Sequence, residues 1–211
     1  MLALDQTLAF LAAAVVLTLT PGPDNLMVLS TGLARGRRAG MAFGLGCGLG
    51  CLSHTLLAVL GVSALLAASP LAFGLLRLLG GAYLVWMGVQ AWRHAGRVTL
   101  GGGSGGGGST ASLGQLFAKG LLANAINPKV VLFFLAFLPQ FVRPAQGAMA
   151  LQLGLLGVVF TAQAALLFGM LGYFSGHVGA WLTRRPEVGP RLDRLAGTLF
   201  IGLGLRLALP G

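Results

Sequence analysis

The sequence has few charged residues, few acidic residues and only two cysteines. Charged residues make up 9% of its 211 positions, whereas a soluble domain carries about 25%, so an ordinary soluble domain is excluded. Four acidic residues leave little for acid–base catalysis. The two cysteines, Cys47 and Cys51, fall in one apolar run and do not suggest a disulfide scaffold. The sequence also has no Walker-type loop, which leaves ATP-driven transport unsupported.

Long apolar runs are what the sequence does contain. Its mean hydropathy is +0.87 and 56% of its residues are hydrophobic. Because a membrane-spanning helix needs about 20 apolar residues, the runs predict an all-α polytopic membrane protein with six transmembrane helices. The expected spans are Leu8–Leu33, Met41–Ala67, Leu71–Trp92, Leu121–Phe141, Met149–Tyr173 and Leu195–Leu209.

The basic residues predict the orientation of these spans. The formal net charge is +10, and the charges form short clusters between apolar runs, which fits an anionic membrane leaflet better than nucleic acid. Most of the clusters lie in the first, third and fifth connections, for example Arg35 to Arg38 and Arg184 to Arg194. By the positive-inside rule, these connections are expected in the cytoplasm and both termini outside.

A Gly/Ser-rich stretch at residues 99–111 divides the chain into two blocks. Its composition is that of an engineered flexible linker, with a naturally Gly-rich loop as the alternative. Residues 1–98 and 112–211 then hold three predicted spans each, within one membrane domain. Because three is odd, the second block inserts upside down, and the prediction is an inverted three-plus-three repeat, a recurring plan of transporters.

The first span of each block contains proline beside polar residues. The two motifs read TPGPDN, from Thr20 to Asn25, and NAINPK, from Asn124 to Lys129. Proline cannot donate a backbone hydrogen bond, and polar backbone freed at membrane depth is tolerated only against protein or a water-filled cavity. The motifs therefore predict two helix breaks and a cavity, with Asp24 at its edge.

Asp24 and Lys129 are expected to lie at the same depth. Asp24 stands eleven residues before Arg35 and Lys129 ten residues after Lys119, which are helical distances of about 16 and 15 Å from one membrane face. We therefore expect the two charges to face each other, or to share one water-filled site, near the midplane. A purely structural ion pair is the alternative, although charges within a membrane are more often functional.

Cys47, Cys51 and His54 share one helical face, at spacings i, i+4 and i+7. Two thiolates and an imidazole could hold a soft metal ion, so a soft-metal exporter or a thiol-based membrane protein is the alternative function. Cysteines in a tightly packed glycine-rich face explain the pattern equally well, since Gly40, Gly44 and Gly48 recur every four residues. His54 could relay protons, or be a neutral histidine that bonds a backbone carbonyl.

Three stretches resemble the lysine-exporter superfamily, in particular its homoserine/threonine-resistance branch. They are TPGPDNLMVLSTGLARGRRAGMAFGLGCGLG, LLGGAYLVWMGVQAWR and NAINPKVVLFFLAFLPQFV, and the likeness covers nearly the whole chain except the Gly/Ser stretch. The resemblance implies export of amino acids or their derivatives across the bacterial inner membrane, by proton antiport and without enzymatic activity. It also implies that residues 21–23 and 127–129 line the substrate path.

An amino acid is a zwitterion, so its site needs an anion for the ammonium group and donors for the carboxylate. Asp24 can supply the first, and Lys129 with amides freed by the breaks can supply the second. We expect Asp24 and His54 to take part in proton coupling. No cofactor is expected, and the chain is a candidate for a homodimer. The expected substrate-binding residues are Thr20, Pro21, Gly22, Pro23, Asp24, Asn25, Asn124, Asn127, Pro128, Lys129 and Gln163.

Overall fold

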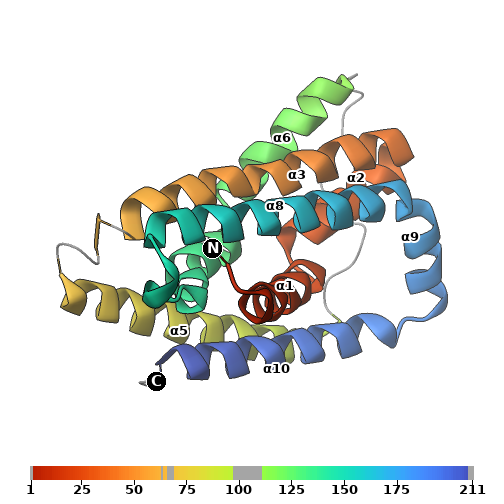
Figure 1. Cartoon of the computed structure of the whole chain (residues 1–211). Helices are drawn as coiled ribbons and strands as arrows, with labels where there is room; N and C mark the ends of the chain where they lie inside the picture. Colours follow the sequence, from red (N-terminus) through yellow and green to blue (C-terminus); the bar gives the residue numbers. More distant parts are fainter. Residues whose placement is uncertain (1, 63, 66–68, 97–110, 209–211) are drawn as a thin grey trace.

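The computed structural model describes residues 2–62, 64–65, 69–96 and 111–208, and this part of the chain is helical without strands (Figure 1). The Gly/Ser stretch predicted at 99–111 lies outside the described residues except for Ala111. The elements are α1 Leu4–Leu19, α2 Pro23–Arg35, α3 Arg37–Leu57, η1 Ala58–Val62, α5 Pro70–Arg93, α6 Leu113–Ala125, α7 Pro128–Leu132, η2 Phe133–Phe137, η3 Leu138–Phe141, η4 Pro144–Gln146, α8 Met149–Tyr173, α9 Ser175–Arg184 and α10 Val188–Ala208.

Both predicted helix breaks are present. The axes of α1 and α2 differ by 55°, and those of α6 and the helical stretch Pro128–Phe141 by 50°. Each second half begins with a proline at its first position, Pro23 in α2 and Pro128 in α7. Proline is favoured there because its missing N–H has no helical partner at that position in any case.

By length and composition, three described helices are able to cross a membrane, and up to five if each bent pair is one span. The three are Arg37–Val62, Leu71–Arg93 and Met149–Tyr173. The sixth predicted span corresponds to α10, which begins at Val188, seven residues earlier than expected. α10 does not reach the same composition because it includes Arg191, Asp193, Arg194 and Arg206.

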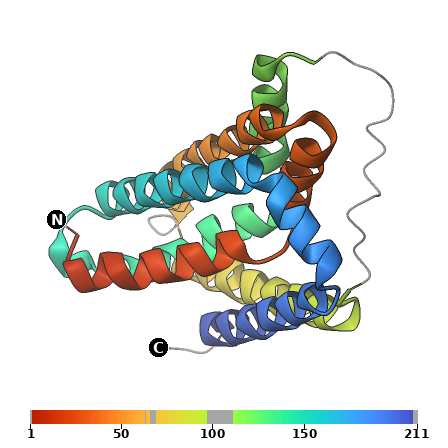
Figure 2. The ribbon, with the colours of Figure 1, turned by 90° about the vertical axis from the view of Figure 1, so that its right-hand side faces the viewer.

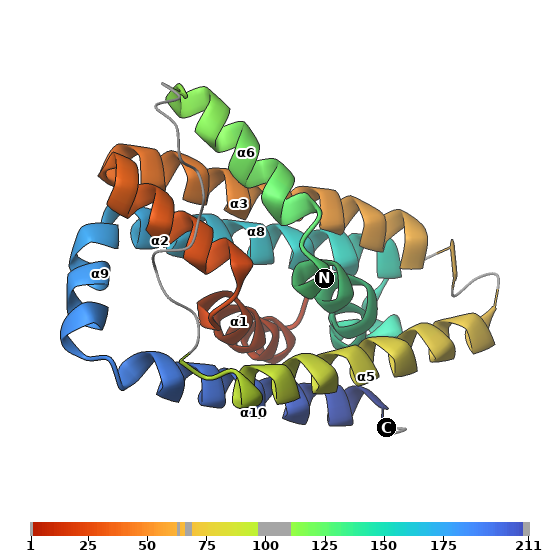
Figure 3. The same ribbon diagram turned by 180° about the vertical axis from the view of Figure 1, so that it is seen from behind.

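The helices form two packed pairs with the broken helices between them. α3 packs along α8 on one edge, and α5 packs along α10 on the opposite edge. Figure 3 shows the same two pairs from behind, with α1 and α2 between them and α6 against α3. Figure 2 shows the start of α1 and the end of α10 toward one side of the molecule, with the α2–α3 turn toward the other.

Glycines allow both pairs to pack backbone against backbone. A Cβ atom on Gly40 of α3 would lie 2.8 Å from the carbonyl oxygen of Gly172 in α8, closer than real contacts allow. In the other pair, Gly81 and Gly204 meet reciprocally, and a Cβ on Gly81 would lie 2.8 Å from the Gly204 carbonyl oxygen. The close packing expected at Gly40 is therefore present, as small residues at membrane helix interfaces permit.

Candidate functional site

At the first break, side chains donate hydrogen bonds to two backbone carbonyl groups at the C-terminal end of α1. Asn25 Nδ2 donates a hydrogen bond to the carbonyl oxygen of Thr18 at 2.9 Å. Lys129 Nζ donates to the carbonyl oxygen of Thr20, also at 2.9 Å. In a continuous helix the N–H groups of Gly22 and Asp24 would bond these two carbonyls, but α1 ends at Leu19, before the Pro-Gly-Pro segment. The ammonium group of Lys129 approaches closely because Gly22 has no side chain, and a Cβ there would lie 3.3 Å from Nζ.

The second break is capped by an asparagine. Asn127 stands at the N-cap of α7, and its Oδ1 accepts a hydrogen bond from the backbone N–H of Lys129 at 3.0 Å. Its own N–H donates to the carbonyl oxygen of Asn124 at 2.9 Å. Asparagine is among the best N-cap residues for this reason, so the NAINPK motif both ends α6 and restarts the helix at Pro128.

The two breaks enclose a small cavity, called here the site cavity. Its volume is about 10 Å³, which is room for roughly one water molecule. The lining consists of residues from α1, α2, α3, α6, α7 and α8 and the connections at the breaks, namely Leu17, Thr18, Gly22, Asp24, Asn25, Cys51, Asn124, Asn127, Lys129, Val130, Phe160 and Phe168.

Asp24 and Lys129 both line the site cavity and both are buried, with 3% and 5% of their surface exposed. The two charges therefore share one cavity, but they do not contact each other directly. Asp24 Oδ2 accepts a hydrogen bond from Asn124 Nδ2 at 2.7 Å, and Lys129 bonds the Thr20 carbonyl instead. Each charge is thus held by a neutral group from the opposite break.

Asn124 connects the charged site to α3. Its Oδ1 accepts a long hydrogen bond from Cys51 Sγ at 3.5 Å, and its backbone carbonyl oxygen lies 2.9 Å from His54 Nε2. Since a carbonyl oxygen only accepts, Nε2 carries the proton. Nδ1 of His54 is then a buried acceptor that has no hydrogen-bond partner in the described structure. His54 lies behind Asn124 and does not line the site cavity.

The other predicted site residues shape the cavity without lining it. Pro21, Pro23 and Pro128 set the two breaks, and Thr20 contributes its backbone carbonyl rather than its hydroxyl, which donates to Val16 O at 2.6 Å. Gln163 of α8 donates through Nε2 to the hydroxyl of Thr18 at 2.9 Å. Gln163 therefore acts on the site cavity through Thr18.

Sequence reasoning missed Thr18 and the apolar part of the lining. Phe160 and Phe168 both come from α8, eight residues apart, with Ala164 between them on the same face. That i, i+4, i+8 spacing was a signal for one helix face, although nothing in the sequence shows which cavity the face meets. Leu17 and Val130 complete the apolar wall.

Lys129 also lies near an aromatic ring of α10. Its Nζ is 5.4 Å from the centroid of the Phe200 ring, a distance at which a cation is attracted to the ring face. This contact links the charged site to the α5–α10 pair. No sequence pattern associates Phe200 with Lys129.

The cysteines and His54 do not form a metal centre. Within the residues that the structure describes, no three His, Cys, Asp or Glu side chains are grouped as a metal ion requires. Cys47 and Cys51 are fully buried free thiols. Both lie where α3 packs against α6, since Cys51 Sγ bonds Asn124 Oδ1 and a Cβ on Gly120 would lie 3.0 Å from Cys47 N.

Apolar helices around a buried, charged cavity at two helix breaks define a polytopic membrane protein with a polar site inside it. The chain belongs to the LysE type translocator family, whose model matches residues 15–211. It is therefore a membrane transport protein and not an enzyme.

Three relatives illustrate the range of this family. The chain is 35% identical to an uncharacterized membrane protein of Vibrio cholerae, over 95% of each chain. It is 35% identical to a homoserine/homoserine lactone efflux protein of Salmonella typhimurium, over 95% of this chain and 94% of the other. It is 29% identical to a leucine efflux protein of an Enterobacter species, over 94% of this chain and 93% of the other. No solved structure matches.

Proposed function

We propose that the chain exports amino acids or their close derivatives from the bacterial cytoplasm, by proton antiport with alternating access to the site cavity. The observation that carries this proposal is the placement of Asp24 and Lys129 in one cavity, buried and not paired with each other. A zwitterionic substrate carries one group for each charge. The printed names of the relatives, homoserine/homoserine lactone efflux protein and leucine efflux protein, support the substrate class.

In the proposed mechanism, Asp24 binds either the substrate ammonium group or a proton. The substrate carboxylate replaces the Thr20 carbonyl as the partner of Lys129, with Asn25, Asn124 and Asn127 as neutral donors. Because Asp24 cannot hold both cations, release of the substrate outside and uptake of a proton become linked. We propose that His54 takes part in the coupling by binding a proton at Nδ1, which has no hydrogen-bond partner in the described structure, and that Asn124, which contacts both His54 and Asp24, connects the two groups.

Alternating access follows from the size of the site cavity. A volume of about 10 Å³ has no room for an amino acid, so the broken helices have to move apart to admit one. We propose that this structure is a closed state, and that α2 and α7 pivot at Gly22 and Asn127. Discontinuous helices at the midplane site of a transporter commonly serve this purpose.

We also propose the six-span inverted repeat, with residues 1–98 and 112–211 as its two halves and both termini outside. The packing supports it, since each element meets its counterpart of the other half. α3 packs with α8, α5 packs with α10, and the broken α1–α2 and α6–α7 meet at the site cavity. A homodimer remains a prediction from the small size and glycine-rich faces of the chain.

The test is efflux from right-side-out membrane vesicles that contain the chain and are preloaded with labelled homoserine, leucine or other amino acids. Wild type is expected to export at least one of them faster when a proton gradient is imposed. Asp24→Asn is expected to lower that gradient-dependent efflux roughly 10- to 100-fold, since a hydrogen bond to a charged group contributes about 1.5–3 kcal/mol.

Glu187→Gln is the matched control, because Glu187 is an exposed acid far from the site cavity in sequence, and it should leave efflux unchanged. Export of no amino acid by wild type would refute the proposed function. Normal, gradient-dependent export by Asp24→Asn would leave Asp24 a structural residue and refute the proposed coupling.

A further inference from the structure

A second cavity lies between the start of α1, the end of η3 and the end of α10. Its volume is about 200 Å³, and a cavity of about 150 Å³ already holds a molecule the size of benzene. It is therefore large enough for a small amino acid, unlike the closed site cavity. Its walls combine polar and aromatic side chains, chiefly Gln6, Phe137, Gln140, Phe141, Arg143 and Arg206.

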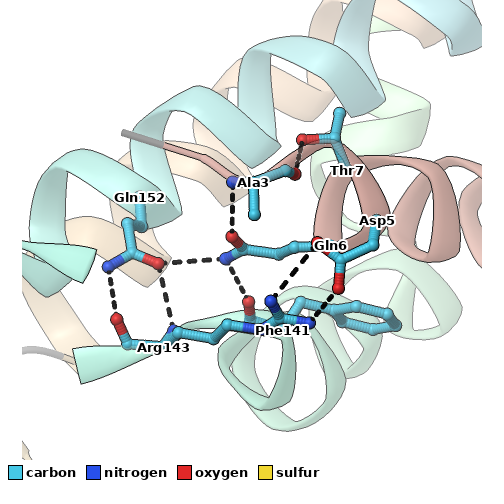
Figure 4. A network of polar contacts seen from close by, with 7 residues as sticks. All are labelled: Ala3, Asp5, Gln6, Thr7, Phe141, Arg143 and Gln152. Carbon is cyan, nitrogen blue, oxygen red and sulfur yellow. Dashed lines mark hydrogen bonds and ion pairs between the residues drawn. The ribbon is translucent and has the colours of Figure 1, made fainter. Parts of the chain in front are cut away.

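The second cavity has an uncompensated positive charge. Two guanidinium groups line it and no acidic side chain does. Arg143 is already paired, with Asp5 Oδ2 at 2.6 Å from its guanidinium group (Figure 4). Arg206 makes no hydrogen bond or ion pair within the described part of the chain. Its planar group, free to form two parallel hydrogen bonds, suits a carboxylate.

Buried amides hold the wall opposite Arg206 in place. Gln6 Nε2 donates to Gln152 Oε1 at 3.0 Å and to the carbonyl oxygen of Phe141. Gln152 in turn accepts from the backbone N–H of Arg143 at 3.0 Å and donates to its carbonyl oxygen at 2.9 Å. Gln6 and Gln152 are each 2% exposed. As Figure 4 shows, this network ties the segment Phe141–Arg143 to α1 and α8, so the cavity wall is fixed before any ligand binds.

A cluster of aromatic rings separates the two cavities. Phe160 lines the site cavity, whereas Phe137 and Phe141 line the second cavity. The Phe10 ring lies between them, with centroids 6.4 Å from Phe160 and 5.2 Å from Phe141. Along α1, the eleven residues from Gln6 to Leu17 correspond to about 16 Å. The second cavity is thus separated from the site cavity by one layer of aromatic rings in edge-to-face and tilted contact, and it lies toward the predicted outer face.

We propose that the second cavity is an exit subsite, which binds the carboxylate of an amino acid after it passes the aromatic rings and before it leaves. Arg206 is the anion-binding group, and Phe137 and Phe141 contact the apolar part of the ligand. This inference rests on the proposed export of amino acids. A lipid phosphate could supply the same anion chemistry, and the experiment separates the two sources.

The experiment uses the full chain with Ala9→Cys, because Ala9 lines the second cavity and the native Cys47 and Cys51 are fully buried. Right-side-out vesicles are treated with membrane-impermeant thiol reagents, one anionic and one cationic. The anionic reagent is expected to react faster. Arg206→Gln should lower the ratio of the two rates roughly fivefold, because a nearby unit charge in water changes the local concentrations of an anion and a cation by about twofold each, in opposite directions.

External leucine or homoserine is expected to slow the labelling of Ala9→Cys. The corresponding amines, which lack the carboxylate, are expected to leave the labelling rate unchanged. Arg206→Gln should abolish this protection, whereas Arg191→Gln, an exposed arginine at the other end of α10, should keep it. Protection should persist with Asp24→Asn, because the two cavities are separate. Ala145→Cys, exposed at the same end of the molecule, should label without protection.

Three results would overturn the exit subsite. One is no reaction of Ala9→Cys with either reagent, since the cavity would then be closed to the outside. Another is protection that survives Arg206→Gln. The third, in liposomes of defined composition, is protection by phosphatidylglycerol but not by amino acids, which would make the ligand a lipid headgroup. Labelling does not depend on transport, so failure of the exit subsite and failure of amino-acid export are read separately.

Discussion

At the scale of single residues, the site holds two opposite charges that do not neutralise each other. A carboxylate at the bilayer centre costs about 2.5–3.5 kcal/mol on insertion scales. Here the cost is offset through Asn124, which donates to Asp24, while the Thr20 carbonyl accepts from Lys129. A neutral partner that moves away to admit a substrate group carries no charge that would then be left unpaired. Its exchange therefore costs less free energy than the breaking of an ion pair.

Asn124→Ala is expected to destabilise the protein by about 1–3 kcal/mol, because it leaves the buried Asp24 carboxylate without its amide donor. In detergent, the thermal midpoint should fall by roughly 2–10 °C. Cys51→Ala is the control, since it removes only the weak thiol hydrogen bond to the same side chain. Equal midpoints for Asn124→Ala and wild type would show that Asp24 does not depend on Asn124.

At the scale of elements, prolines decide where helices break and glycines decide which helices touch. The Pro-Gly-Pro and Asn-Pro motifs divide two potential spans into half-helices bent by 55° and 50°. Between the intact helices, missing side chains bring backbones together, as at Gly40 and Gly172. The elements that surround the site are therefore rigidly packed, and the elements that carry its charges are interrupted.

Gly40→Val is expected to destabilise the α2–α3–α8 contact, since even a Cβ would lie 2.7 Å from Gly32 Cα and 2.8 Å from Gly172 O. Overpacking of this kind costs about 1–3 kcal/mol, which thermal unfolding in detergent measures. Gly74→Ala in α5 is the control, because nothing lies within 4 Å of its added Cβ. That change should stabilise by about 0.5–1 kcal/mol through helix propensity, so a fall in both midpoints would contradict the assignment of Gly40 as a packing contact.

At the scale of the whole molecule, helices of the first half pack on their predicted counterparts in the second. The start of α1 and the end of α10 lie toward the same side (Figure 2), as six spans would require. By helix length and composition, the described residues hold up to five candidate spans, because α10 is rich in charge. α10 nevertheless packs against α5 and places the Phe200 ring 5.4 Å from Lys129 Nζ.

The topology prediction is that both termini face outward. A bacterial alkaline phosphatase fused after Gly211 should be active, and the same enzyme fused after Arg38, in the first basic connection, should be inactive. Green fluorescent protein at the same two points should give the opposite pattern. An active phosphatase after Arg38 together with an inactive one after Gly211 would show that the orientation is opposite to the predicted one. If fusions after Arg38 and after Gly211 lie on the same side of the membrane, α10 does not span it.

The sequence by itself determined the helical membrane class, both helix breaks and the common location of Asp24 and Lys129. These follow from local chemistry, since hydropathy and the missing N–H of proline act on the chain wherever they occur. Only the tertiary structure decided that Asn124 and Thr20 hold the two charges, that Phe160 and Phe168 close the cavity, and that a second cavity exists beside Arg206. The two hydrogen bonds join residues 100 and 109 positions apart, and helix packing, which no local pattern encodes, brings them together.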